Sequence, residues 1–201
     1  MNTCGITIMP EYIQSEGIST VLDRLEEAGI KQVGTSPYYM IPTEEGVGHR
    51  EPPIDAGSGK VRLLDRPLWG KNELWFRVIP SFVANLELYQ GLRYQPPVCE
   101  DTPENLLNDF IAAAAQRDIK VYFQIMAAIP PALRVQDGGP FEEDLALLPD
   151  GNPLVEPLSK NGSLASSEIL DYTKALTRDL LEQHPGLAGI RFDWPEYPCY
   201  H

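Results

Sequence analysis

Two carboxylates and an arginine stand close together in the segment GIRFDWPEYP at residues 189–198. Asp193 ends a short apolar run that is typical of a buried strand. Arg191 precedes it by two residues, so both side chains are expected on one face of that strand. A carboxylate beside an arginine is held ionised and available to a substrate. The same two residues also permit a purely structural interpretation, as an ion pair locked inside the fold. Glu196 is expected on the loop beyond the strand.

Four apolar segments have the length and composition of buried strands, and amphipathic segments separate them. The strands are expected at residues 4–9, 31–37, 120–131 and 187–194. Helices are expected at residues 17–28, from Thr102 onward, and from Ser166 or Ser167 to about 183. This alternation favours parallel βαβ units covered by helices.

Each expected strand has an apolar face and a second face that carries polar groups. A closed (β/α) barrel has helices on one side only, whereas an open doubly wound sheet needs two apolar faces. We therefore predict an α/β protein of the (β/α)-barrel type with polar side chains in its interior. These interior residues are Thr7, Ser36, Gln124, Arg191 and Asp193.

The expected elements amount to the first four βα units of a TIM barrel, with a long insertion after the second strand. The insertion is an excursion at about residues 41–100, and a second long loop covers about residues 132–164. Four strands cannot close an eight-stranded barrel, and open sheet edges promote aggregation unless they are paired. We therefore expect residues 1–201 to be the N-terminal half of a larger catalytic domain. Their partner is the remainder of the barrel or, alternatively, a second half-barrel of the same kind.

Three of these segments resemble barrel strands of the α-amylase superfamily, in the right order. GIKQVGTSPYY (29–39), DIKVYFQIMA (118–127) and GIRFD (189–193) resemble its second, third and fourth strands. The sequence is also similar to uncharacterised glycoside-hydrolase-like barrels whose fourth strand ends in Asp followed by aromatic residues and Tyr-Pro. The resemblance implies a glycoside hydrolase with Asp193 as its nucleophile and Arg191 as the arginine that orients it.

The sequence departs from the amylase pattern at two places. The third strand of that family carries an Asp and then Asn-His, where this chain has Gln124 and then Ala127-Ala128-Ile129. The acid/base Glu of the family belongs to its fifth strand and a further Asp to its seventh, and both lie beyond this chain. Glu196 is the alternative acid if its carboxyl lies about 5–5.5 Å from that of Asp193.

The resemblance implies a saccharide substrate, and several further residues are candidates to contact it. Aromatic rings stack on the apolar CH faces of sugars, which suggests Trp194 beside Asp193 and the tyrosines Tyr38 and Tyr39 after the second strand. Gln124 on the third strand and Asn161 in the loop that follows it are candidates to bind hydroxyl groups.

Composition excludes several other classes of partner. The chain has 16 basic and 29 acidic residues, and a net charge of -13 repels nucleic acid and anionic membranes. The sequence shows no membrane span and no signal peptide, so we expect a cytoplasmic protein. The spacing of the cysteines does not indicate a metal site. The sequence also has no glycine motif of the kind that binds the phosphates of a nucleotide cofactor. His184 is expected to cap a helix dipole.

Two rival functions remain open at this point. One is a catalytically silent barrel that binds carbohydrate or a protein partner through the excursion, with Trp69 and Trp75 as stacking residues. The other is a metal-dependent sugar isomerase or aldolase whose divalent metal is held by Asp193 and Glu196. The scarcity of histidine, with three in the chain, and the lack of a lysine at a strand end count against the second.

Overall fold

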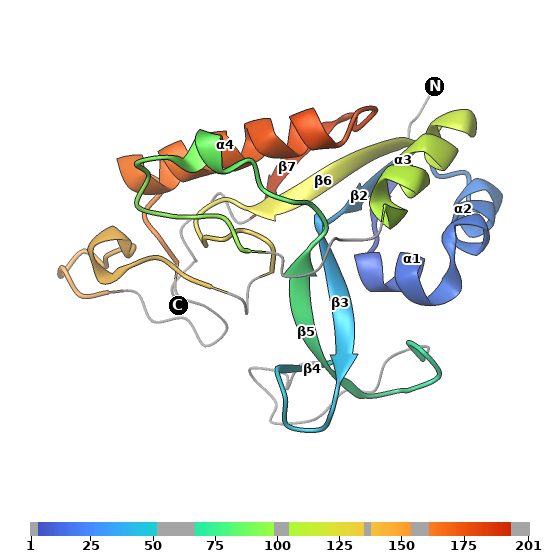
Figure 1. Ribbon diagram of the computed structural model, residues 1–201, viewed down its shortest axis with the longest axis horizontal. Coiled ribbons are helices and arrows are strands. Elements are labelled where there is room, and N and C mark those ends of the chain that lie inside the picture. Colours follow the sequence, from blue (N-terminus) through green and yellow to red (C-terminus); the bar gives the residue numbers. More distant parts are fainter. Residues whose placement is uncertain (1–3, 52–66, 99–104, 135–137, 154–160, 194–201) are drawn as a thin grey trace.

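The computed structural model describes residues 4–51, 67–98, 105–134, 138–153 and 161–193 (Figure 1). Its centre is a four-stranded parallel sheet with the order β1-β2-β6-β7. The strands are β1 (Gly5–Thr7), β2 (Gln32–Thr35), β6 (Lys120–Met126) and β7 (Gly189–Asp193). Each strand pairs with the one that precedes it in this order, so the sheet grows at one edge as the chain proceeds. The expected mixed α/β fold with a parallel sheet is confirmed.

Within the described ranges, four α-helices connect these strands. They are α1 (Pro10–Glu16), α2 (Ile18–Glu27), α3 (Leu106–Gln116) and α4 (Ser167–Gln183). The helix expected at residues 17–28 corresponds to α2, and Gly29 follows it in the left-handed conformation with φ of 69°. Ser166 caps α4 as expected, because its Oγ accepts a hydrogen bond from the Ile169 amide at 3.2 Å. The expected cap at Thr102 lies outside the described residues.

The core lies between the helices and one face of the parallel sheet. On β6, Val121, Phe123 and Ile125 are at most 2% exposed, while the residues between them are partly exposed. The face of α4 predicted to point inward is buried as well. Its residues are Ile169, Tyr172, Leu176 and Leu180. Side-chain alternation therefore identified correctly which face of β6 the helices cover.

The sequence patterns missed one helix and made the expected strands of the parallel sheet too long, most of all the third. Helix α1 was not expected, although Pro10 occupies its first turn. The strand expected at 120–131 ends at Met126, because the Ala132 amide donates to the Ile129 carbonyl and closes a turn around two prolines. A proline has no amide hydrogen to donate to a neighbouring strand.

The excursion contains a second, antiparallel sheet, which we call the hairpin sheet. Its strands are β3 (Tyr38–Thr43), β5 (Leu74–Pro80) and β4 (His49–Glu51), in the order β3-β5-β4. The hairpin sheet begins only two residues after β2, earlier than the expected start of the excursion near residue 41. Figure 1 shows β3 and β5 extending away from the parallel sheet beside α1.

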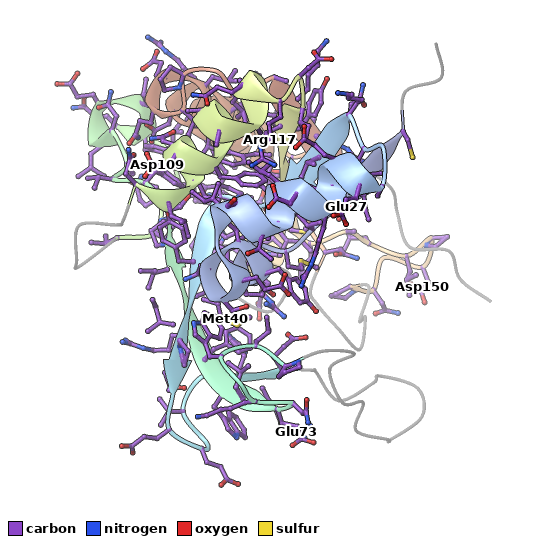
Figure 2. All side chains as sticks on the ribbon, turned by 90° about the vertical axis from the view of Figure 1, so that its right-hand side faces the viewer. Glu27, Met40, Glu73, Asp109, Arg117 and Asp150 are labelled. Atoms are coloured by element: carbon purple, nitrogen blue, oxygen red, sulfur yellow. The ribbon has the colours of Figure 1, made fainter. Side chains whose placement is uncertain are left out.

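The hairpin sheet has a small core of its own. Met40, Leu68, Leu74 and Phe76 are buried in it, and the Met40 amide donates to Gln14 Oε1 of α1 at 2.9 Å. Figure 2 shows Met40 where α1 meets the hairpin and Glu73 near the far end. Trp75 lies on the opposite face of β5 from Phe76, so Phe76 rather than the tryptophan supplies the aromatic packing.

The 3-10 helix η1 (Leu86–Tyr89) lies near the end of the excursion and contacts α4. A second 3-10 helix, η2 (Glu142–Asp144), lies in the loop after β6. Asp179 of α4 is completely buried. Its Oδ2 accepts hydrogen bonds from the Tyr89 hydroxyl at 3.0 Å and the Asn85 amide at 3.1 Å. No described helix is long and apolar enough to cross a membrane.

His184 at the C-terminal end of α4 is buried and neutral, which corrects the expected charged cap. The side chain is 3% exposed, and its Nδ1 lies 2.7 Å from Asn108 Oδ1. Burial lowers the pKa of His184 to about 4. The cation that would interact favourably with the helix dipole is therefore absent at neutral pH.

We expect the buried His184 to make the fold sensitive to acid. The unfolded chain binds a proton near pH 6.5 and the folded chain only near pH 4, so stability falls as the pH drops through this window. The loss at pH 4.5 relative to pH 7.5 is about 2 kcal/mol. Urea unfolding of the wild type and of His184→Gln at both pH values measures it as the difference between the two proteins. Identical pH dependence of the two proteins would contradict the prediction.

Candidate functional site

The predicted nucleophile lies at the carboxyl end of the parallel sheet, on the face that the helices leave open. Asp193 is the last residue of β7 and pairs in register with Met126 of β6. Gln124 Nε2 donates a hydrogen bond to Asp193 Oδ2 at 2.6 Å. The prediction that Gln124 and Asp193 share one face is therefore confirmed. One oxygen of the carboxylate is fixed by an amide donor from the neighbouring strand.

Gly34 on β2 makes room for a third side chain on this face. An alanine at position 34 would place its Cβ 2.9 Å from Arg191 Nη1 and 3.2 Å from Thr7 Oγ1. The Arg191 guanidinium thus reaches across β6 to the backbone of β2. Gln124 Oε1 would lie 3.8 Å from the same Cβ. Thr7, Gln124, Arg191 and Asp193 are therefore gathered on the open face as expected, and we call these four residues the open-face cluster.

The interpretation of Arg191 and Asp193 as a buried ion pair is wrong for the described part of the chain. Arg191 is exposed, and no ion pair within 4.0 Å joins it to a described carboxylate. Its guanidinium points towards Gly34, and Asp193 instead accepts from the neutral amide of Gln124. Side chains two positions apart on a strand stand roughly parallel to each other. The long arginine side chain extends instead across the sheet, into the space above Gly34.

The two tyrosines after β2 lie in the interior of the protein. Tyr39 is 4% exposed, and its Oη accepts a hydrogen bond from the Leu107 amide in the first turn of α3 at 3.2 Å. Tyr38 is 2% exposed, and its hydroxyl donates to Glu11 Oε2 at 3.4 Å. The structure therefore brings neither ring to the open-face cluster.

Of the remaining predicted site residues, Asn161 is the one that lies within the described residues. Asn161 is buried in the loop after β6, where its carbonyl accepts from the Ala146 amide at 2.9 Å. Trp194 and Glu196 fall outside the described residues. The proposed separation of the Glu196 and Asp193 carboxyls therefore stays a prediction.

A second cluster of charged residues was not predicted from the sequence. It lies beyond the carboxyl ends of β1, β2 and β6. We call it the Arg134 cluster, and it consists of Glu11, Tyr38, Glu51, Phe76 and Arg134. Arg134 Nη1 lies 3.6 Å from Glu11 Oε1, and Nη2 forms an ion pair with Glu51 Oε2. The guanidinium carbon lies 4.7 Å from the centre of the Phe76 ring. This cluster ties α1, the hairpin sheet and the loop after β6 together.

Burial dominates the electrostatics of the Arg134 cluster. Burial raises the pKa of Glu11, and the positive charge of Arg134 opposes that rise. Burial also raises the pKa of the Tyr38 hydroxyl, and the negative charge of Glu11 adds to the effect. Burial disfavours the charged form of Arg134, but nearby Tyr38, Glu51 and Glu11 keep its pKa above the usual value. The cluster holds the hairpin sheet in place and offers a substrate no exposed carboxylate.

The described residues do not form a metal centre. No group of three or more His, Cys, Asp or Glu side chains in the described ranges is arranged to hold a metal ion. The metal-dependent alternative places one of its two ligands at Glu196, beyond those ranges, so it stays untested. The open-face cluster by itself offers one carboxylate, one amide, one hydroxyl and one guanidinium.

Comparisons with known proteins show similarity to solved structures but not to any family model or curated sequence. No protein-family model matches the chain, and no curated protein matches it in sequence. Among solved structures, the chain is similar to a noncanonic maltogenic α-amylase from Thermotoga neapolitana, with a TM-score of 0.49 and 13% sequence identity. The match covers 98% of this chain and 40% of the amylase, so the chain spans less than half the length of that protein.

Proposed function

We propose that the chain belongs to a (β/α)-barrel glycoside hydrolase, in which Asp193 attacks the anomeric carbon of a saccharide. The observation that carries the proposal is the position of Asp193. It ends the fourth parallel strand on the helix-free face, with Gln124 Nε2 at 2.6 Å from its Oδ2. Ligands of parallel α/β proteins bind at the carboxyl ends of the strands.

The proposed reaction proceeds by two displacements. A carboxylate oxygen of Asp193 forms a bond to the anomeric carbon while the bond to the leaving oxygen breaks. A separate carboxylic acid protonates the leaving oxygen, and water then releases the sugar from Asp193. We assign that acid to the remainder of the barrel, with Glu196 as the alternative.

The other members of the open-face cluster act on this carboxylate and on the substrate. The Gln124 amide donates to one oxygen of Asp193 and fixes the rotation of the carboxylate. Arg191 and Thr7 lie towards β2, where a guanidinium and a hydroxyl are suitable partners for sugar hydroxyl groups. The barrel itself is part of the proposal, supported by four sequential parallel strands with their helices on one face.

Covalent trapping tests this assignment. We expect an activated 2-deoxy-2-fluoro glycoside to inactivate the complete gene product with one label per molecule, because the fluorine slows release of the glycosyl intermediate. Mass spectrometry of the digested protein should place the label on the peptide that contains Asp193. Incubation with excess unlabelled saccharide serves as the control and should protect the protein. A label on another carboxylate, with Asp193 unmodified, would refute the role of Asp193.

A second candidate function is carbohydrate binding without hydrolysis, through the excursion. Trp69 is 37% exposed, and Trp75 lies on the face of the hairpin sheet opposite its small core. These positions support a role for both indoles in stacking on a sugar ring. Saccharide binding that survives substitution of Asp193 and disappears in Trp69→Ala or Trp75→Ala would favour this function over the first.

A further inference from the structure

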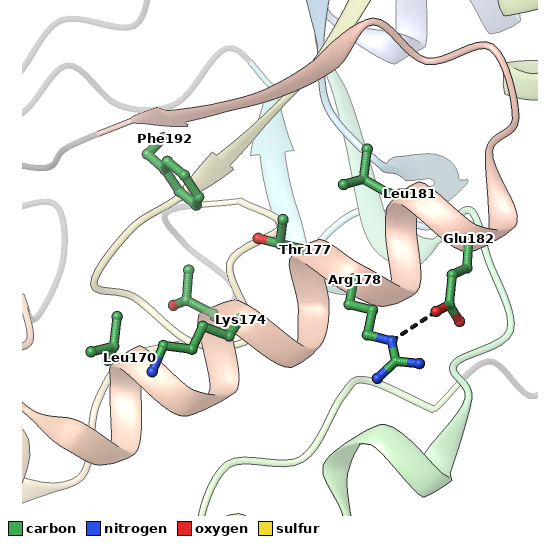
Figure 3. A pocket seen from close by; sticks show the side chains of 8 residues that line it. Leu170, Lys174, Thr177, Arg178, Leu181, Glu182 and Phe192 are labelled. Carbon is green, nitrogen blue, oxygen red and sulfur yellow. Dashed lines mark hydrogen bonds and ion pairs between the residues drawn. The ribbon is translucent and has the colours of Figure 1, made fainter.

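An apolar groove of about 430 Å³ runs along α4 beside β7 (Figure 3). Leu170 and Leu181 mark its two ends on the helix, and Phe192 of β7 lies on the opposite side. These three side chains are 49%, 44% and 48% exposed. Exposed apolar side chains that line one continuous groove indicate a surface that a partner covers.

The exposure of Phe192 stands out against its neighbour in the sheet. Phe192 pairs in register with Ile125 of β6, so both side chains point to the helix-covered face. Ile125 is completely buried, whereas Phe192 is half exposed. Among the described residues, α4 and Phe192 of β7 line this groove, and no second helix contributes a side chain to it. The helix layer is therefore interrupted at the groove.

The topology of the sheet determines what would fill this gap. The strands join the sheet in chain order at one edge, and β7 is at that edge with its outer side unpaired among the described strands. A crossover between neighbouring parallel strands is right-handed, so every connecting helix lies on the same face. The helix that connects β7 to a further parallel strand would therefore lie next to α4, over Phe192.

We infer that this groove is the docking site of an amphipathic helix from a further βα unit of the same polypeptide, whose strand pairs with β7. The inference rests on the proposed barrel and identifies the surface where its next unit attaches. The groove extends from Leu170 to Leu181, which corresponds to about 16 Å or three helical turns. The docking helix must be at least that long, with apolar residues at positions i, i+3, i+4 and i+7.

Charge favours such a helix over a second copy of this chain. A two-fold axis through the groove would bring Lys174 and Arg178, which lie near its middle, close to their own copies. Two chains of net charge -13 also repel each other. Lys174 and Arg178 form ion pairs with Asp171 and Glu182 of the same helix, which leaves the apolar floor of the groove for the partner.

Thiol accessibility tests the inference without reference to catalysis. Leu181→Cys is introduced into a background in which Cys4, Cys99 and Cys199 are replaced by Ser, and its maleimide reaction rate is measured. The matched control is Leu86→Cys on η1, because Leu86 is 63% exposed and lies outside the groove. Both thiols should react rapidly in the 201-residue chain. In the complete gene product the thiol at position 181 should react about tenfold more slowly, with no change at position 86.

Three results would overturn the inference. The first is equal reactivity at position 181 in the short chain and the complete gene product. The second is a reading frame that ends after His201. The third is protection of position 181 that rises with the concentration of the short chain, together with a doubled mass in light scattering, which assigns the groove to a second copy. Protection in a product that hydrolyses no glycoside would support the docking site and refute the proposed function separately.

Discussion

Replacement of Asp193 by Asn is expected to lower kcat/KM of the complete gene product for a glycoside by at least about 10⁴-fold. The amide of Asn is too weak a nucleophile to attack the anomeric carbon. It has nearly the same shape as the carboxyl, and its oxygen can still accept the Gln124 Nε2–H bond. The free energy of unfolding should therefore change by less than about 1 kcal/mol.

The control for this substitution is Asp118→Asn. Asp118 is an exposed carboxylate two positions before the start of β6, at the opposite end of the parallel sheet from Asp193. Its substitution removes the same charge and should leave turnover unchanged. Glycoside turnover by Asp193→Asn within about tenfold of the wild type would show that Asp193 is not the nucleophile. Saccharide affinity measured on the same variant separates loss of chemistry from loss of binding.

Local sequence patterns predicted the parallel part of the fold well. The strands of the parallel sheet are short apolar runs, and helices α2 and α4 have both a regular apolar face and a recognisable end. Such signals depend on residues close together in the chain. Helix α1 has only seven residues, and β3 continues almost directly from β2, so neither produced a separate pattern.

The candidate site was predictable only where strand alternation decides the answer. Gln124 and Asp193 share a face because each strand alternates with period two, and the sequence alone was sufficient to place them together. The direction of the Arg191 side chain depends on the space at Gly34, two strands away in the sheet. No local pattern contains that information. The same limit applies to Tyr39, because its hydroxyl accepts a hydrogen bond from the Leu107 amide of α3, which is distant in the sequence.

The Arg134 cluster is the clearest example of a feature that sequence patterns cannot reveal. Glu11, Glu51 and Arg134 belong to three separate segments, and each alone is an ordinary charged residue. Together they lie in the interior, where the side chains of Glu11, Arg134 and Glu51 are 3%, 11% and 14% exposed. Buried charges of this kind persist only when they are paired, so each of the three depends on the others.

Replacement of Arg134 by Met is therefore expected to lower the free energy of unfolding by about 3–5 kcal/mol at pH 7. Methionine fills similar space beside Phe76 but leaves Glu11 and Glu51 without their buried cation. The pKa of Glu11, which burial already raises, should rise further without Arg134. A carboxyl whose pKa is higher in the folded state than in the unfolded state favours folding as the pH falls. The difference in free energy of unfolding between the wild type and Arg134→Met should therefore be smaller at pH 5 than at pH 7.

Two further variants distinguish this electrostatic cause from a simple loss of packing. The double substitution Glu11→Gln with Arg134→Met removes one unpaired buried charge and should recover part of the lost stability at pH 7. Arg178→Met removes an exposed arginine that pairs with Glu182 on the surface of α4, and it should leave stability nearly unchanged. Urea unfolding at pH 7 and pH 5 measures all of these proteins. The electrostatic explanation fails if Arg134→Met loses the same free energy of unfolding at both pH values and Glu11→Gln restores none of it. In that case Arg134 stabilises the fold through its contact with Phe76 rather than through its charge.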